Sequence, residues 1–196
     1  MLIRLFLYSL FAMPAVVLAD ASEGQFMGFE LGKTYPELPQ DVDVTTAGNL
    51  LIAATNPTKP ADIEQVSLIV TPKSRTIGYI VAASWHPTES EAREFGRRYA
   101  ELLRAKYPDW EFGRELMDAS LRIVEVNFDK APHNLQLSLV REEIEGRSMW
   151  RISMGLGWHK ETREWQAWQS RAATENAAAK ATESKQILEE ADTRGL

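Results

Sequence analysis

The fold is decided by one stretch of the sequence, Trp150-Arg151-Ile152-Ser153-Met154-Gly155-Leu156-Gly157-Trp158. Its large apolar residues alternate with charged or small ones. A period of two is typical of a β-strand that buries one face. We therefore predict a strand here, with Trp150 and Trp158 on the same buried face.

Six further segments resemble strands and are separated by short polar or proline-containing connections. They cover residues 25–31, 49–55, 66–71, 76–85, 121–128 and 135–139. Consecutive strands joined by short connections usually pair as antiparallel neighbours. The sequence therefore predicts an α+β fold, built on one or more antiparallel sheets with packed helices.

The first predicted helix follows the strand at 76–85. Thr88 and Glu91 have the spacing of a capping box, and Pro108 ends the segment. Its apolar residues recur at steps of three and four, which predicts one shared face that packs on the sheet. These residues are Ala92, Phe95, Tyr99, Leu102 and Leu103. Thr34 and Glu37 have the same capping spacing, which predicts about one helical turn before Pro39.

A second helix is predicted from about residue 160. Trp165, Trp168 and Ala172 share one face and are expected to pack on the sheet. Beyond Ala172 the chain is rich in Ala, Glu and Lys, so helix propensity is high but the packing stripe is thin. We predict an α+β domain over residues 20–172 and an exposed helical tail over residues 173–196.

Residues 49–106 and 122–179 line up at an offset of 73, and each segment reads strand, strand, strand, helix. Trp85-His86 ends the third strand of the first segment, and Trp158-His159 ends that of the second. The pattern indicates two βββα halves. They are either a duplication or a coincidence of the kind that α+β domains often show.

The first 19 residues are predicted to be a signal peptide. Arg4 precedes a short apolar run over residues 5–18, and Ala19 precedes the polar Asp20. The run is shorter than the about 20 residues of a membrane-spanning helix. No other stretch is apolar enough to span a bilayer. We therefore expect a soluble periplasmic or secreted protein, with no transmembrane segment after cleavage.

Composition excludes several classes of function. The 196 residues carry a net charge of −6 and no cysteine. A general nucleic-acid binder needs clustered positive charge, so no nucleic-acid partner is expected. Without cysteine there is no thiol nucleophile and no zinc–thiolate site, and three scattered histidines give no metal-ligand pattern. The sequence carries no cofactor signal.

Two groups of residues are candidates for a functional site. His86 and His159, each next to a strand end, are weak candidates for a catalytic base of a periplasmic hydrolase that would use a nearby carboxylate. Trp110 and Trp168 are candidate binding residues that we expect to be exposed. Arg97 and Arg98 are a candidate site for an anionic partner, or else part of a solvated helix face.

The opening motif Gly32-Lys33-Thr34-Tyr35-Pro36-Glu37-Leu38 resembles the start of the SmpA/BamE-like envelope proteins. This resemblance implies a small exported α+β module that binds partner proteins during outer-membrane assembly. The chain departs from the pattern at Pro36 and Pro39, which shorten any helix, and in having no lipid-bearing cysteine. No functional residue is carried over.

These observations favour a soluble, non-catalytic binding or accessory protein of the bacterial periplasm. The expected partner is another envelope protein, and the C-terminal helix offers a route to a homo-oligomer. Two alternatives stay open: the hydrolase built on His86 or His159, and a ligand-binding or inhibitor module that uses a sheet face.

Overall fold

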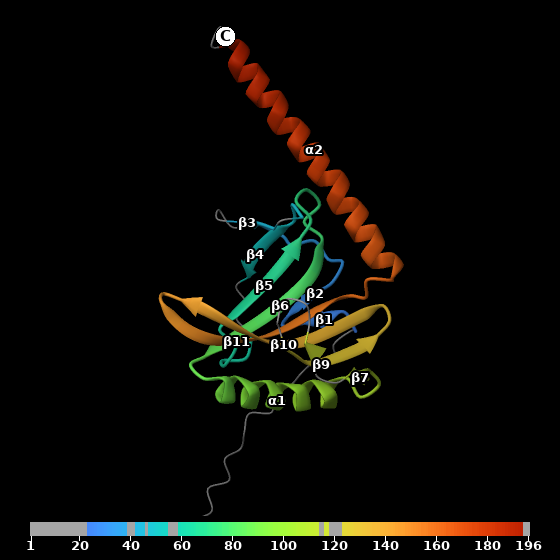
Figure 1. Cartoon of the computed structure of the whole chain (residues 1–196). Coiled ribbons are helices and arrows are strands. Elements are labelled where there is room, and N and C mark those ends of the chain that lie inside the picture. The colour runs from blue at the N-terminus through green and yellow to red at the C-terminus, as the bar shows by residue number, and fades with distance from the viewer. Residues whose placement is uncertain are drawn as a thin grey trace, which may run out of the picture.

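The computed structural model of the chain describes residues 23–38, 42–45, 47–54, 59–113, 116–117 and 123–193. The predicted signal peptide at residues 1–19 lies outside the described residues. Within them, two helices and two antiparallel sheets form the α+β fold that the alternation pattern predicts (Figure 1).

The larger sheet is antiparallel throughout and has the order β3-β4-β5-β6-β11-β10-β9-β7, with β8 beside β9. Its strands are β3 (Asp43–Val44), β4 (Leu50–Ala54), β5 (Gln65–Val70), β6 (Ile77–His86), β7 (Glu111–Gly113), β8 (Leu116–Met117), β9 (Ile123–Lys130), β10 (His133–Ile144) and β11 (Arg147–Trp158). β10 is much longer than the predicted segment 135–139. Pairing with β9 and β11 on its two sides carries it beyond the leucines into polar sequence.

The two strand triplets β4-β5-β6 and β9-β10-β11 meet where β6 pairs with β11. Val81 lies opposite Gly155, and Ala82 lies opposite Met154. An offset of 73 residues carries Val81 onto Met154 and Ala82 onto Gly155, so each pair maps onto the other. The strands therefore follow a pseudo-two-fold arrangement about this point, whereas the two helices do not take equivalent places, because the helix after β6 packs on the sheet and the helix after β11 docks at the β5–β6 loop. A common origin of the two halves stays a prediction.

Helix α1 (Glu89–Lys106) covers the apolar face of β6, β11 and β10, and its predicted capping box at Thr88 and Glu91 is present (Figure 1). The largest buried side chains on this face include Ile80, Leu137 and Ile152. Trp150 and Trp158 are partly buried and pack against the same core. The prediction for Leu102 is wrong. Leu102 is half exposed because it lies about 100° around the helix from the buried Leu103.

The N-terminal segment closes the core beside α1. The predicted strand at 25–31 is instead a tight hairpin of β1 (Gln25–Phe26) and β2 (Phe29–Glu30), because Met27 and Gly28 turn the chain with positive φ. The predicted helical turn at Thr34 is also absent. Thr34 forms a β-bridge with Thr76, and the following Pro36 disfavours helical geometry at Tyr35.

Helix α2 (Arg163–Thr193) is docked on the body only through its first half. Trp168 and Ala172 are buried, which agrees with the packing face predicted for this helix and contradicts the exposure expected for Trp168 as a binding residue. The Glu175 carboxylate accepts hydrogen bonds from the backbone N–H groups of Lys73 and Ser74, at 2.8 and 3.0 Å. Docking therefore extends past residue 172, the predicted end of the domain, because Glu175 satisfies two N–H groups of the β5–β6 loop.

The rest of α2 projects away from the body (Figure 1). Asn176 still donates to the Ala47 carbonyl oxygen, and every residue from 177 to 190 is exposed. We call residues 177–190 the arm. Neither α1 nor α2 has a stretch long and apolar enough to cross a membrane, and the same holds for the rest of the described chain.

Candidate functional site

The two candidate catalytic histidines lie at opposite ends of the sheet. His86 ends β6 and pairs with Trp150 near the start of β11, whereas His159 follows the last residue of β11. Trp150 and His159 are nine steps apart along extended chain. At about 3.3 Å per step, this corresponds to a distance of about 30 Å. The fold therefore does not bring the two histidines into one site.

His159 takes part in the turn that starts α2. Its backbone N–H donates to the Pro132 carbonyl, and its own carbonyl accepts from the Thr162 hydroxyl at 2.8 Å. Thr162 in turn accepts from the Trp165 N–H. These contacts make His159 a helix-entry residue.

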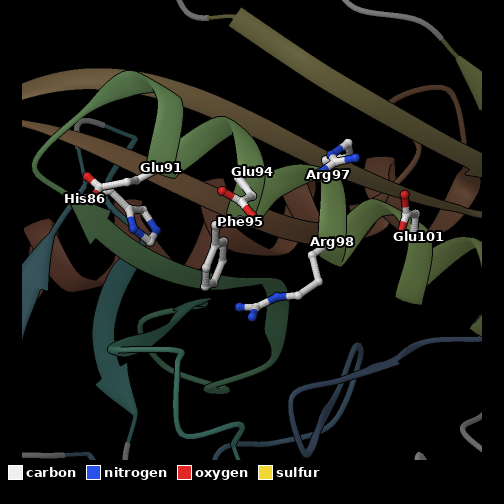
Figure 2. Close-up of a pocket in the computed structure, with 7 residues that line it drawn as sticks. All are labelled: His86, Glu91, Glu94, Phe95, Arg97, Arg98 and Glu101. Atoms are coloured by element: carbon white, nitrogen blue, oxygen red, sulfur yellow. The ribbon is translucent and has the colours of Figure 1, made fainter.

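His86 lies in a shallow groove along α1 with both candidate arginines. The groove has a volume of about 450 Å³ and is lined by His86, Glu91, Glu94, Phe95, Arg97, Arg98 and Glu101. Figure 2 shows His86, Phe95 and Arg98 on one side of the helix, whereas Arg97 points to the other side. The structure therefore assembles three of the six candidate site residues, His86, Arg97 and Arg98, around one helix.

Two of the six polar side chains that line the α1 groove, Glu91 and Arg98, already have partners. Arg98 pairs with Asp62 at 2.5 Å, and its guanidinium lies 5.2 Å from the centre of the Phe95 ring. Asp62 also accepts from the Tyr99 hydroxyl. An anionic partner of Arg98 would have to displace Asp62. His86 packs its ring on Phe95 at 4.8 Å, and its Nε2 is buried without a hydrogen-bond partner, which does not suit a catalytic base.

The buried histidines make stability depend on pH. Burial lowers the pKa of His86 below 6.5, with Glu64 and Glu91 opposing the shift, and burial also lowers the pKa of His133. The unfolded chain therefore binds more protons than the folded chain below about pH 6.5. We expect the free energy of unfolding to fall as the pH decreases from about 6.5 toward about 5.

Denaturant unfolding of the parent and of the double variant His86→Gln/His133→Gln tests this expectation. The pKa of Glu175 is lowered by hydrogen bonds from Ser74 and Lys73, which outweigh its burial, and that of Glu23 by Lys130. Both carboxylates lose their stabilising contribution only below about pH 4.5, so they do not act in this window. The variant is expected to lose less stability than the parent between about pH 6.5 and about pH 5. Equal losses would contradict the assignment.

The expected exposure of Trp110 and Trp168 is wrong. Trp110 is 7% exposed, because the chain reverses after Pro108 and lays its ring on Tyr107 and opposite His133. Trp168 is 5% exposed and lies directly over Gly78, where a Cβ atom would come within 2.2 Å of the indole ring. Both tryptophans therefore hold the fold together.

Comparison with known proteins adds no information about these candidate site residues. No protein family, curated protein or solved structure matches the chain. The resemblance to the SmpA/BamE-like proteins therefore rests on the seven residues 32–38. Among the described residues no three His, Asp or Glu side chains are grouped so that they could hold a metal ion.

Sequence reasoning missed the face of the sheet opposite α1. By alternation with the core residues, this face carries Ile69, Tyr79, Val81, Trp85 and Val140, all partly exposed, and between them lie the polar Ser67, Gln136, Arg151 and Ser153. The contacts of α2 with the body fall at the β5–β6 loop, at Gly78 and at Ala47-Gly48. The contacts of α1 are with the opposite face of β6, β10 and β11. We call the sheet face that carries Ile69, Tyr79, Val81, Trp85 and Val140 the open face.

Trp85 is held rigidly on the open face. Its indole N–H donates to Glu142 at 3.2 Å, and Glu142 pairs with Arg151 at 3.1 Å. Its backbone N–H donates to Glu64 at 2.9 Å. A fixed tryptophan on a partly exposed surface is the kind of anchor that protein interfaces use, because little side-chain freedom is lost on binding.

The open face ends in a second groove beside the turn of the β10–β11 hairpin. We call it the hairpin groove. It has a volume of about 400 Å³ and is lined by Glu64, Trp85, Ile144, Glu145, Arg147 and Met149. Its apolar side chains lie between carboxylates and one guanidinium. This combination suits an apolar protein segment with charged neighbours better than a buried small molecule.

Proposed function

We propose that this chain is an exported, non-catalytic binding protein of the bacterial envelope that docks a partner protein on its open face. The observation that carries the proposal is the partly exposed Trp85, which Glu142 and Glu64 fix on the sheet face opposite α1 with apolar neighbours. A fixed aromatic side chain on a partly exposed surface commonly anchors a protein interface. The separation of His86 from His159 favours binding over hydrolysis.

Export is the first part of the proposal to test. The leader-like segment 1–19 predicts that the protein recovered from the producing bacterium begins at Asp20. Cell fractionation followed by intact-mass measurement checks this. The periplasmic or secreted fraction is expected to hold a chain shortened by 19 residues. A cytosolic protein that retains Met1 would contradict export.

Binding on the open face is tested by photo-crosslinking in intact cells. A photoreactive residue in place of Val81 or Val140 is expected to give an adduct with one envelope protein. The same residue in place of Leu102, which is half exposed on the outer side of α1, serves as the matched control. Asp in place of Val81 should abolish the adduct formed from position 140, because a charge in the patch must be desolvated on binding. Equal adducts at all three positions, or none, would contradict the proposal.

A further inference from the structure

The described chain ends in an apolar pair that packs on nothing. Ile187 and Leu188, on the arm, are 61% and 70% exposed, and they are consecutive in the sequence. Lys185 and Glu189 flank them, one turn apart and 3.7 Å from each other. The arm tip therefore presents two aliphatic side chains beside the Lys185–Glu189 pair, with further carboxylates at Glu183 and Glu190.

The hairpin groove has the complementary arrangement. Trp85, Met149 and Ile144, which is 38% exposed, supply apolar surface. Glu145 and Arg147 supply one charge of each sign at the hairpin turn, and Glu64 supplies a second carboxylate beside Trp85. A segment seated there could set its lysine against Glu145 and its glutamate against Arg147, while its aliphatic pair covers Ile144 and Met149. The arm tip has this composition.

The arm cannot reach the hairpin groove of its own chain. Successive contacts of α2 run from Trp168 over Gly78 to Glu175 at the β5–β6 loop, which is away from Trp85 along β6. The arm continues in that direction beyond the loop (Figure 1). Its 14 residues extend it by about 21 Å at about 1.5 Å per residue. Only a second molecule can bring an arm tip and a hairpin groove together.

We propose that the arm of one copy docks in the hairpin groove of a second copy. Ile187 and Leu188 cover Ile144, Met149 and Trp85, Lys185 pairs with Glu145, and Glu189 pairs with Arg147. The exchange is reciprocal, because a two-fold dimer presents each groove to the other arm. The contact patches are small, so the dimer forms in a concentration-dependent manner.

The chain contains no cysteine, so engineered cysteine pairs report this contact without background. Purified protein with Ile144→Cys is mixed with protein carrying Leu188→Cys under mild oxidation. A disulfide requires Cα atoms within about 7 Å, so only docked arms should give the covalent heterodimer. Leu102→Cys mixed with Leu188→Cys is the control, because Leu102 is an exposed leucine far from the groove.

The outcomes separate the possibilities. A heterodimer that forms faster than in the Leu102 control supports arm-in-groove docking. Predominant Leu188–Leu188 dimers would mean that two arms pair with each other, and this overturns the proposal. No adduct above the control also overturns it.

Sedimentation equilibrium provides a second, cysteine-free test. Leu188→Asp is expected to raise the dimer dissociation constant about tenfold or more, because it removes a buried aliphatic side chain. Arg147→Glu should raise the constant several-fold, and adding Glu189→Arg should restore it. The absence of any dimer in the parent, or of rescue in the charge-swapped pair, contradicts the docking.

This inference goes beyond the proposed function, and the two fail separately. An envelope protein captured at Val140 without any Ile144–Leu188 adduct leaves the proposed function standing and refutes the exchange of arms. A second result is also possible, in which both the photo-crosslink at Val140 and the disulfide at Ile144 join only two copies of this chain. That result supports the exchange of arms and refutes an envelope partner on the open face.

Discussion

Replacing Phe128 by alanine is expected to lower the free energy of unfolding by about 3–5 kcal/mol. Phe128 lies in the middle of β9, is 0% exposed, and pairs with Leu135 of β10. Truncation removes a whole ring from a packed interior and leaves a cavity that the surrounding sheet fills only in part. Denaturant unfolding of the parent and the variant measures the loss.

Phe112 provides a matched control for this substitution. It lies opposite Phe128 on β7, the two rings meet edge to face at 5.4 Å, and Phe112 is 44% exposed. Phe112→Ala removes the same atoms from the edge of the sheet, where water replaces them, so a loss of at most about 1.5 kcal/mol is expected. Equal losses in both variants would mean that β9 does not belong to the core.

The alternation of side chains predicted the sheet because it depends only on local sequence. The strand at Trp150–Trp158, the hairpin partners of this strand and the capping box at Thr88 were all found where the pattern placed them. Short-range signals suffice for such elements, since a buried face imposes a period of two on a strand and about 3.6 on a helix.

Burial that depends on distant segments could not be predicted in this way. Gly155 and Gly157 look like breaks in a strand, but the ring of Tyr79 lies over both, and a Cβ at Gly155 would come within 2.3 Å of the Tyr79 hydroxyl. Trp110 is buried because the chain reverses onto Tyr107 and His133. Each contact joins segments of the chain whose packing against each other cannot be predicted from the periodicity of either segment.

The candidate site likewise contains some features that local sequence predicts and others that depend on distant segments. Sequence reasoning named His86, Arg97 and Arg98, which the structure brings together around α1. It did not find the open face, although the residues of β6 and β10 that form it alternate with the core. Alternation tells which residues share a face, whereas the placement of both helices decides which face stays uncovered. Trp85 is the sequence signal that could have indicated the open face, because this large aromatic residue lies on the side of β6 opposite to the alternating buried residues.

Trp168→Ala is expected to release α2 from the body. The indole is 5% exposed and fills the space over Gly78, and truncating a buried tryptophan costs about 3–5 kcal/mol. The remaining contacts come from the small Ala172 and from the polar Arg171, Glu175 and Asn176, so they cannot replace this apolar packing. Amide hydrogen exchange should show lost protection in α2, while β6, β10 and β11 stay protected.

Trp165→Ala separates this effect from a general loss of aromatic surface. Trp165 lies one turn earlier on the same helix, contacts Trp168 at 5.2 Å between ring centres, and is only partly buried. Its truncation should leave most of the protection of α2 in place. A helix without tertiary packing is marginal in water, so an undocked α2 loses the fixed direction of its arm. If Trp168→Ala left the exchange of α2 unchanged, the arm would be held by its polar contacts alone, and Glu175 rather than Trp168 would orient it.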